Sequence, residues 1–546
     1  MKGYTLRQSS AVSRRLFLAS AAAAAVATGL PRGLTAQSPT GRRFVIREDR
    51  FGRMFPGVEP FFRENTPRLQ EALRDIGKPG GMLDAQDELG DGGKQAAINL
   101  IVDPNLSVNN PNNPSHTAGT TFIGQFLDHD MTFDLTSRLA VVTEPLASPN
   151  ERTPAFDLDS VYGGGPMVDQ ELYVVPPRTS RERATKLRIE SGGLFEDLPR
   201  NSERTAIIAD PRNDENMIIS GLQAAMILFH NKAVDLVRDR DRRLSSDEAF
   251  DRARQLTTWH YQWMIVHEFL PLFVGQPMVN DILRNGRRFY RPQVGFIPIE
   301  FQGAAYRFGH SMVRPSYRAN LAGDNDGSPF FGMVFDQSGE GQSDPVDLRG
   351  SARARRRFIG WQTFFDFGPT FTDGPGNTNP AIRPNKLIDT KISSPLFDLP
   401  VATIAGGVGR GDPVSLPARN LLRQVTWGMP SGQSLARLMR VPVVPSSDEV
   451  LRDLRQYRLN LEESTPLWLY VLREAAVLAN GRTLGPVGGR IVGEVFIGLL
   501  ELDRDSYLWQ RGWRPTLPTR SGRVTGDFRM ADFLTFAGVD PTSRGQ

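Results

Sequence analysis

Apolar side chains recur at steps of three and four residues along five segments, at 217–240, 247–273, 431–440, 463–478 and 487–503. This spacing puts the apolar side chains of each segment on one face of a helix. Alternating apolar and polar positions, which are typical of half-buried strands, are scarce. The pattern therefore predicts a mainly α-helical fold with little β-structure.

Breaks in this pattern predict where the elements end. Pro271 is expected to end the helix at 247–273, and Asn213 or Asp214 to cap the helix that begins at 217. Stretches rich in Gly and Pro at 321–328, 366–384 and 403–417 predict long surface loops. No repeat or shift in composition divides the chain further, so 37–546 is predicted to be one large domain.

The first forty residues differ from the rest. Arg14 and Arg15 precede a short Ala-rich apolar run, and the stretch from Ser13 to Leu18 resembles a bacterial twin-arginine signal. A membrane-spanning helix requires ~20 apolar residues, which this run does not reach. Residues 1–36 are therefore expected to be an export signal that sends the protein to the periplasm or the medium, and no transmembrane segment is expected elsewhere.

Charge and cysteine content exclude several functions. The formal net charge is +4, but residues 1–40 contain five basic and no acidic residues, so the remainder is close to neutral. That balance gives no reason to expect nucleic-acid binding. The chain has no cysteine, which excludes disulfides, thiolate metal sites, iron–sulfur clusters and cysteine nucleophiles.

The segment TFIGQFLDHDMTFD, at 121–134, holds the densest group of reactive side chains. On a helix, Gln125, Asp128 and His129 share one face, whereas Asp130 is about 200° round the axis from Asp128. Charged groups in such an apolar frame are costly to bury without partners. The segment fits a surface helix with incidental charges. It fits equally well a helix with a reactive pocket on one side and a cation-binding site on the other.

Four further segments carry candidate chemistry. In TPAFDLDSVYGGGP, at 153–166, Thr153, Asp157 and Asp159 supply the oxygen atoms that a hard cation such as Ca²⁺ requires, although a solvated Asp-rich turn is equally common. The others are 209–231 with Arg212 and Glu215, 306–314 with His310, and 416–432 with Asn420 and Arg423. By itself, His310 more often represents a core histidine than a ligand.

The remaining histidines receive no role. His260 and His267 are seven residues apart on one predicted helical face, but the HExxH pattern of zinc hydrolases is absent. Both are predicted to line the core. His230 is predicted to be structural, and His116 has no assigned role.

Taken together, GQFLDHD, FDLDSVYG, DPRNDEN, YRFGHS and NLLR follow the order found in the animal-type haem peroxidase superfamily. The resemblance covers roughly residues 50 to 535 and includes relatives such as myeloperoxidase, peroxinectins and cyclooxygenases. It implies a large, mainly α, single-domain peroxidase fold with long irregular loops. The export signal fits a bacterial branch of the superfamily.

The resemblance also implies site residues. His129 matches the distal histidine, Gln125 the distal glutamine and Arg212 the distal arginine. His310 matches the proximal iron ligand, Asn420 the acceptor of its second ring N–H, and Arg423 an arginine near a haem propionate. Asp128 and Glu215 match carboxylates that form ester links to haem in mammalian members. The implied calcium ligands are Asp130, Thr153, the carbonyl of Ala155, Asp157 and Asp159.

The implied function is an exported peroxidase containing haem b and Ca²⁺. It would reduce H₂O₂ through a ferryl intermediate and oxidise a halide, thiocyanate or a small phenol-like donor. Asn216 stands where myeloperoxidase has a methionine bonded to haem, so that sulfonium link is impossible here and strong chloride oxidation is disfavoured.

Two other functions remain possible. Fatty-acid oxygenases of the superfamily place a radical-forming tyrosine three residues before the proximal histidine, where this chain has Arg307, and Tyr306 is one residue further upstream. That shift rotates a helical side chain by about 100°. The other possibility is a calcium-dependent adhesion protein that uses the same fold without catalysis.

Overall fold

The computed structural model describes residues 49–540, except 178–182, 192–194, 353, 369–381, 405–406 and 410. The predicted export signal at 1–36 lies outside the described residues.

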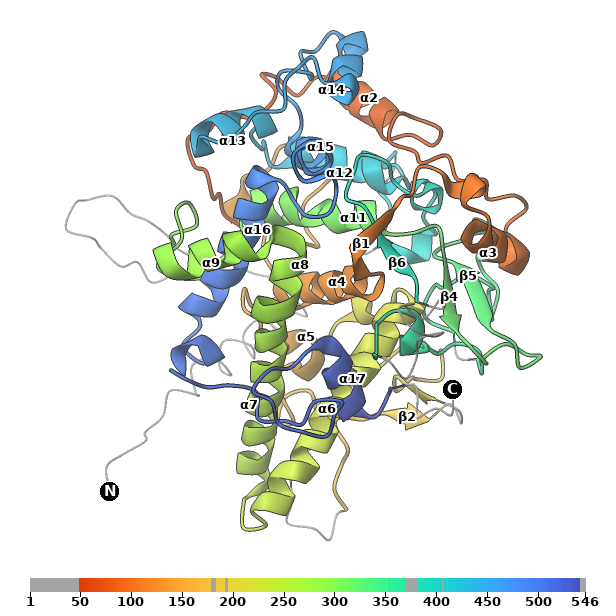
Figure 1. The fold of residues 1–546 in the computed structure, drawn as a ribbon, viewed down its shortest axis with the longest axis vertical. Coiled ribbons are helices and arrows are strands. Elements are labelled where there is room, and N and C mark those ends of the chain that lie inside the picture. The colour runs from red at the N-terminus through yellow and green to blue at the C-terminus, as the bar shows by residue number, and fades with distance from the viewer. Residues whose placement is uncertain are drawn as a thin grey trace, which may run out of the picture.

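Helices dominate the described chain and enclose a central helix, α4 (Figure 1). The α-helices are α2 (Pro67–Ile76), α3 (Gly93–Val102), α4 (Gly119–Met131), α5 (Asp159–Tyr162), α6 (Met217–Arg240), α7 (Ser246–Met264), α8 (Leu270–Val274), α9 (Gln276–Asn285), α10 (Ile299–Gln302), α11 (Gly309–Met312), α12 (Leu416–Thr426), α13 (Gly432–Met439), α14 (Glu449–Asp453), α15 (Leu467–Ala479), α16 (Pro486–Leu502) and α17 (Met530–Ala537). The mainly α-helical prediction is confirmed, and each of the five predicted helical segments contains a helix.

The described strands form three small antiparallel pairs. These are β1 (Asn112–Thr117) with β6 (Pro384–Lys386), β2 (Glu190–Ser191) with β3 (Glu196–Asp197), and β4 (Ser316–Asn320) with β5 (Phe330–Met333). The first pair matters for the site, because α4 and α11 both pack against β6.

The prediction that Pro271 ends its helix is wrong. After α7 the chain makes a π-helical turn, η5 (Ile265–Phe269), and continues through Pro271 in the first turn of α8. The π-turn already interrupts the α-helical hydrogen bonds just before Pro271, so its missing N–H removes no regular bond. Gly275, with φ of 82°, ends α8 instead.

The predicted cap of α6 is also corrected. Asn216, rather than Asn213 or Asp214, is the N-cap, and its side chain accepts hydrogen bonds from the N–H groups of Ile218 and Ile219. Asn213 and Asp214 lie in the preceding 3₁₀ turn, η4 (Pro211–Asp214). The cap therefore comes after the turn that carries Arg212.

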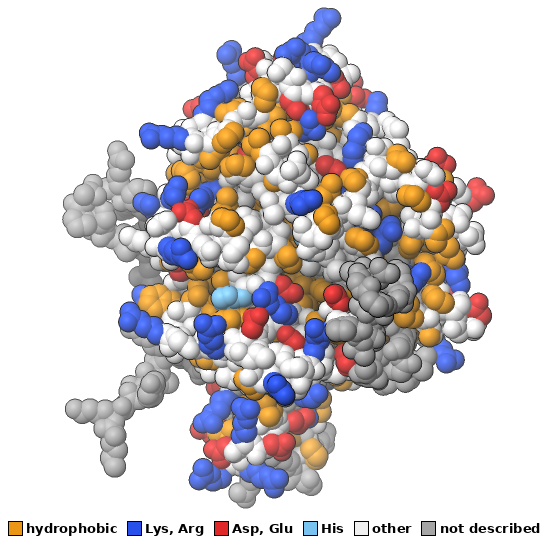
Figure 2. Space-filling model, in the orientation of Figure 1, with side chains coloured by type: hydrophobic (Ala, Val, Ile, Leu, Met, Phe, Trp, Pro, Cys, Tyr) orange, Lys and Arg blue, Asp and Glu red, His pale blue; other side chains and the backbone are white. Residues whose placement is uncertain are grey.

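The long helices α6 and α7 pack side by side, and α17 lies against α6 (Figure 1). Among the described helices, α6 alone has the length and composition of a membrane-crossing helix, which the sequence analysis did not expect. However, 72% of its most apolar window is buried inside the fold, as in the core helix of a globular protein. Figure 2 shows basic and acidic side chains interspersed over one face of the molecule.

Candidate functional site

Helix α4 presents three predicted site residues to one internal cavity. Gln125, Asp128 and His129 line this cavity, which has a volume of about 290 Å³. The helix begins where Gly119 packs against Phe365, since a Cβ at Gly119 would lie 2.4 Å from that ring. This close contact positions the start of α4, and thereby the face of the helix that carries Gln125, Asp128 and His129.

His129 is held as a neutral base. It is 4% exposed, and its Nδ1 lies 2.9 Å from Oδ1 of Asn213, whose Nδ2 in turn donates to Gln223. Because an amide oxygen only accepts, Nδ1 carries the proton and Nε2 is the free base. Burial, helped by the charge of Arg212, lowers the pKa of His129 to about 3.

Arg212 lies beside His129 in the cavity wall. Its Nη2 donates to the backbone carbonyl of His129 at 3.0 Å, and its guanidinium carbon is 4.0 Å from the centre of the Phe133 ring. Asp210 accepts from both Nε and Nη2 of Arg212, and also from Arg152. Burial alone would raise the pKa of Asp210, but these two arginines hold it well below its usual range. Asp210 therefore fixes the orientation of the Arg212 guanidinium.

Glu215 and Gln125 line the same cavity and are hydrogen-bonded to each other. Gln125 donates to Glu215 and accepts from Nδ2 of Asn216, while Oε1 of Glu215 is 3.8 Å from Nε2 of His129. Burial raises the pKa of Glu215 to about 8 and also raises that of Asp128. Glu215 therefore favours the protonated form at neutral pH.

His310 faces the same cavity from α11. Burial, and secondarily the charge of Arg307, lowers its pKa to about 3, so the imidazole is neutral. Its Nδ1 lies 2.7 Å from Nδ2 of Asn420, whose Oδ1 accepts from Arg307 at 3.0 Å. The family resemblance implies that Asn420 accepts a hydrogen bond from His310. The structure differs because Arg307 occupies the amide oxygen.

Arginines lie along the rest of the cavity. Arg423, Arg419 and Arg307 line it, and burial lowers the pKa of all three. Arg423 pairs with Asp134 at 3.0 Å. Apolar side chains such as Phe335, Leu399 and Ile404 supply much of the remaining wall.

This donor set fits a haem. Two neutral imidazoles, apolar walls and guanidinium groups suit an iron porphyrin with two acidic side chains. Oε1 of Gln302, which lines the cavity, is buried without a hydrogen-bond partner among the described residues. A group or water bound in the cavity would satisfy it.

The predicted calcium carboxylates also come together. Asp130, on α4 but outside the cavity lining, meets Asp157 and Asp159, and one carboxylate oxygen from each lies within 4.8 Å of the others. Burial and the two neighbouring acids raise the pKa of Asp130 well above its usual value. Of the other predicted ligands, the backbone N–H of Thr153 donates to Asp159, and the backbone N–H of Ala155 donates to the Thr153 carbonyl. Clustered oxygen atoms of this kind suit Ca²⁺.

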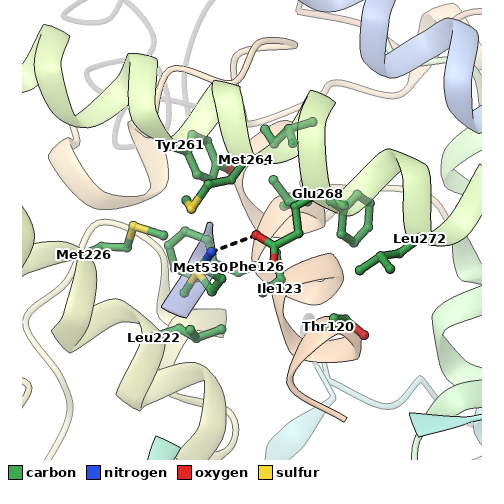
Figure 3. A pocket seen from close by; sticks show the side chains of 13 residues that line it. Thr120, Ile123, Phe126, Leu222, Met226, Tyr261, Met264, Glu268, Leu272 and Met530 are labelled. Carbon is green, nitrogen blue, oxygen red and sulfur yellow. Dashed lines mark hydrogen bonds between the residues drawn. The ribbon is translucent and has the colours of Figure 1, made fainter. Parts of the chain in front are cut away.

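A second, mostly apolar cavity lies behind α4 (Figure 3). Glu268 of the π-turn accepts from the backbone N–H of Met530, and Phe269 lies between this cavity and the first, lining both. No predicted site residue lines it. Glu268 thus anchors the start of α17.

The other histidines have structural partners. His230 contacts the hydroxyl of Tyr162 and the carbonyl of Thr185, and His260 is fully buried. His267 stacks on Trp263 at 3.7 Å. His116 joins a buried amide network on β1 and β6.

Known proteins resemble this chain over part of its length. A family model described as animal haem peroxidase matches residues 135–338, which include Arg212 and His310 but begin just after His129. Heme peroxidase 2 of Caenorhabditis elegans is 24% identical over 315 residues, 55% of this chain and 39% of that protein. Chorion peroxidase of Drosophila melanogaster is 24% identical over 319 residues, 56% of this chain and 35% of that protein. The chain thus spans less than half the length of these curated relatives.

Solved structures share the fold. Peroxidase A of Dictyostelium discoideum superposes with a TM-score of 0.52 at 15% identity, covering 82% of this chain and 88% of that one. A fatty acid α-dioxygenase of Arabidopsis thaliana gives 0.53 at 17% identity, covering 84% and 73%. Residues 135–338 therefore match an animal haem peroxidase domain, and the chain shares the fold of these solved peroxidase and dioxygenase structures.

Proposed function

We propose that this protein is a haem-dependent peroxidase that reduces H₂O₂ and oxidises a small donor. The observation that carries the proposal is that His129 and His310, both neutral, reach one cavity from separate helices. A peroxidase needs one imidazole to hold the iron and another to move a proton. The names of the curated relatives support the same activity.

In this proposal His310 would hold the iron of haem b, and Arg423 and Arg419 would pair with its acidic side chains. Such a haem would supply the redox chemistry that breaks the peroxide O–O bond. Nε2 of His129 accepts the proton from H₂O₂ and returns it to the departing oxygen, as general base and then general acid. Arg212, held by Asp210 and the His129 carbonyl, supplies a fixed positive charge beside that oxygen.

Small organic donors such as phenols are the preferred reductants in this proposal, ahead of chloride. Nε and Nη2 of Arg212 are engaged by Asp210, and Gln125 already donates to Glu215, so these two residues have few free donors left to hold an anion. Asn216 cannot form a sulfonium link to haem. Bromide, iodide and thiocyanate are the anions to compare with a phenol.

Three finer features belong to the same proposal. Ca²⁺ bound by Asp130, Asp157 and Asp159, with Thr153 and the Ala155 carbonyl, would offset their negative charge and brace α4. Asp128 and Glu215, which line the cavity, would form ester links to haem methyl groups. Haem that is extracted into acidic organic solvent would contradict the ester links. The segment from Ser13 to Leu18 supports export by a twin-arginine route.

A fatty-acid oxygenase is the second candidate, favoured by one observation. Tyr306 lines the cavity, where its buried hydroxyl donates to the Gly124 carbonyl of α4 at 2.9 Å. A tyrosine at the haem pocket is what radical abstraction from a fatty acid requires. Oxygen uptake with linoleate in the absence of added peroxide would support this function, and its absence would leave the peroxidase.

The proposal is tested by absorbance of the purified, haem-loaded protein before and after H₂O₂, and again after bromide, iodide or a phenol. We expect a Soret band that shifts with peroxide and returns fastest with the phenol. His310→Ala should lose the band or its response. A wild-type protein that takes up no haem, or a His310→Ala variant with normal turnover, would overturn the proposal.

A further inference from the structure

One buried amide, on strand β6, touches both helices that carry the site imidazoles. Asn385 is 0% exposed and pairs with Asn113 of β1. Its Oδ1 accepts from Oγ1 of Thr121 at 2.9 Å. Its Nδ2 lies 3.0 Å from Nδ1 of His116, donates to Oγ1 of Thr120 at 3.2 Å and lies 3.6 Å from Sδ of Met312. Both threonines belong to the first turn of α4, and Met312 is the last residue of α11.

These contacts reach the cavity itself. Thr121 and Met312 both line it. Thr121, Gln125 and His129 follow at intervals of four residues and so form one stripe along α4. Met312 comes two residues after His310. Asn385 therefore contacts Thr121, on the same face of α4 as His129, through its amide oxygen. Through its amide nitrogen it contacts Met312, at the end of the helix that carries His310.

The surrounding contacts leave this amide little freedom to move. Its backbone carbonyl accepts from Arg314, and Oδ1 also accepts from the backbone N–H of Lys386. Ser311 of α11 is fixed by two hydrogen bonds to Asp389, just after β6. Tyr306 provides a second tie to α4 through Gly124. Buried, fully bonded polar networks of this kind define one geometry rather than several.

We propose that Asn385 is a positioning residue. It sets the position of α4 relative to α11, and thereby the separation of His129 and His310 across the cavity. The inference rests on the proposed function only in that the cavity receives haem. Asn385 touches neither imidazole. Its effect is to fix where the two helices present them.

The test compares variants that break this tie with one that does not. Asn385→Ala removes both halves of the amide, and Thr121→Val removes one hydrogen bond, whereas Thr121→Ser keeps the hydroxyl. Asn113→Ala is the comparison variant, because Asn113 is 1% exposed and bonds to the Arg482 carbonyl and His116, so it reaches Thr120 of α4 and Asn385 only indirectly, through His116. The readouts are thermal unfolding of the haem-free proteins, the ferric electron paramagnetic resonance spectrum and the rate of haem loss.

We expect Asn385→Ala and Thr121→Val to change the ferric spectrum and to lose haem faster, on the order of tenfold for Asn385→Ala. Thr121→Ser should match the wild type. Asn113→Ala should unfold at a lower temperature but keep the wild-type spectrum. If Asn385→Ala fails to fold, the comparison of Thr121→Val with Thr121→Ser tests the inference instead. The inference would be overturned if Asn385→Ala had the same ferric spectrum and rate of haem loss as Asn113→Ala, or if Thr121→Val matched Thr121→Ser in both. Either result would leave the proposed function standing. A wild-type chain that takes up no haem would overturn the proposed function and this inference with it.

Discussion

At the scale of single residues, an amide partner decides how each imidazole of the site is presented. Asn213 accepts from Nδ1 of His129 and is itself held by Gln223, so Nε2 is the basic nitrogen. Asn420 meets His310, but its oxygen is occupied by Arg307. An acceptor role for Asn420 would require its amide to turn away from Arg307. The two imidazoles are thus neutral for the same reason, burial, yet differ in how they are held.

Replacing His129 should slow the reaction with peroxide while haem remains bound. A general base contributes about 10²- to 10⁴-fold to such a step, so His129→Gln should lower the rate constant for H₂O₂ by a factor in that range. Stopped-flow absorbance measures this rate. His230→Gln, a change at a buried histidine outside the cavity, is the control and should react normally. An unchanged rate in His129→Gln would contradict the proposed role.

Sequence motifs identified the reactive side chains but not the groups that hold them. Gln125, His129, Arg212, Glu215 and His310 were selected from the sequence, and the structure brings all five to one cavity. Asp210, Asn213 and Arg307 lie within three residues of them and were given no role at the site. Nothing in a sequence distinguishes these polar residues from solvent-exposed ones, because their roles arise only from contacts across the fold.

At the scale of elements, hydrophobic spacing was enough to locate the helices. The segment predicted at 217–240 has the bounds of α6. The π-turn Ile265–Phe269 was missed, because one wider turn hardly alters the apolar spacing. Asn385 was also missed, since a buried amide on a three-residue strand has no sequence signature. Local periodicity specifies an element, whereas irregular turns depend on what packs beside them.

The start of α4 should tolerate no added side chain. A Cβ at Gly119 would lie 2.4 to 2.6 Å from three atoms of the Phe365 ring. Overpacking of this kind typically costs about 1–3 kcal/mol, so Gly119→Ala should lower the free energy of unfolding by that amount. Denaturant titration measures it. Adding Phe365→Leu should recover part of the loss, and a Gly119→Ala protein as stable as wild type would show that the ring can move aside.

Calcium should stabilise the fold through the cluster of Asp130, Asp157 and Asp159. A ligand that binds only the folded state at a hundred times its Kd adds about 2.7 kcal/mol. Thermal unfolding in EDTA and in rising Ca²⁺ should therefore show a saturable increase in Tm. Asp157→Asn should abolish most of this increase, whereas Asp235→Asn, at an exposed ion pair with Lys186, should retain it. A Tm that does not respond to Ca²⁺ would contradict the proposed site.

At the scale of the whole molecule, buried histidines make stability depend on pH. Burial lowers the pKa of all six: to about 3 for His129 and His310, and to about 4 for His116, His230, His260 and His267. In the unfolded chain their pKa is near 6.5. As pH falls below 6.5, the unfolded state binds protons that the folded state does not, so stability is lost.

Buried carboxyl groups act in the opposite direction over part of this range. Burial raises the pKa of Glu215 to about 8 and those of Glu268 and Glu474 to about 7. Between these values and about 4.5 the folded state holds protons that the unfolded state has lost, so stability rises as pH falls. Burial also raises the pKa of Asp503 to about 6, so below pH 6.5 the six histidines and the buried carboxyl groups oppose each other.

The haem-free protein should therefore gain stability as pH falls from 8 to about 6.5, and should lose it steeply only below about pH 4.5, where the carboxyl groups are protonated in both states and no longer oppose the histidines. Calorimetric Tm and denaturant titrations from pH 8 to 4 measure this curve. His230→Phe tests its origin: the variant should be less stable at every pH, because Tyr162 and Thr185 lose a buried partner. Its acid slope should nevertheless be shallower, by up to about 1.4 kcal/mol per pH unit, since one titrating group is gone. An acid slope as steep as that of the wild type would show that other groups control acid stability, and a maximum above pH 8 would show that the buried carboxyl groups are ionised without penalty.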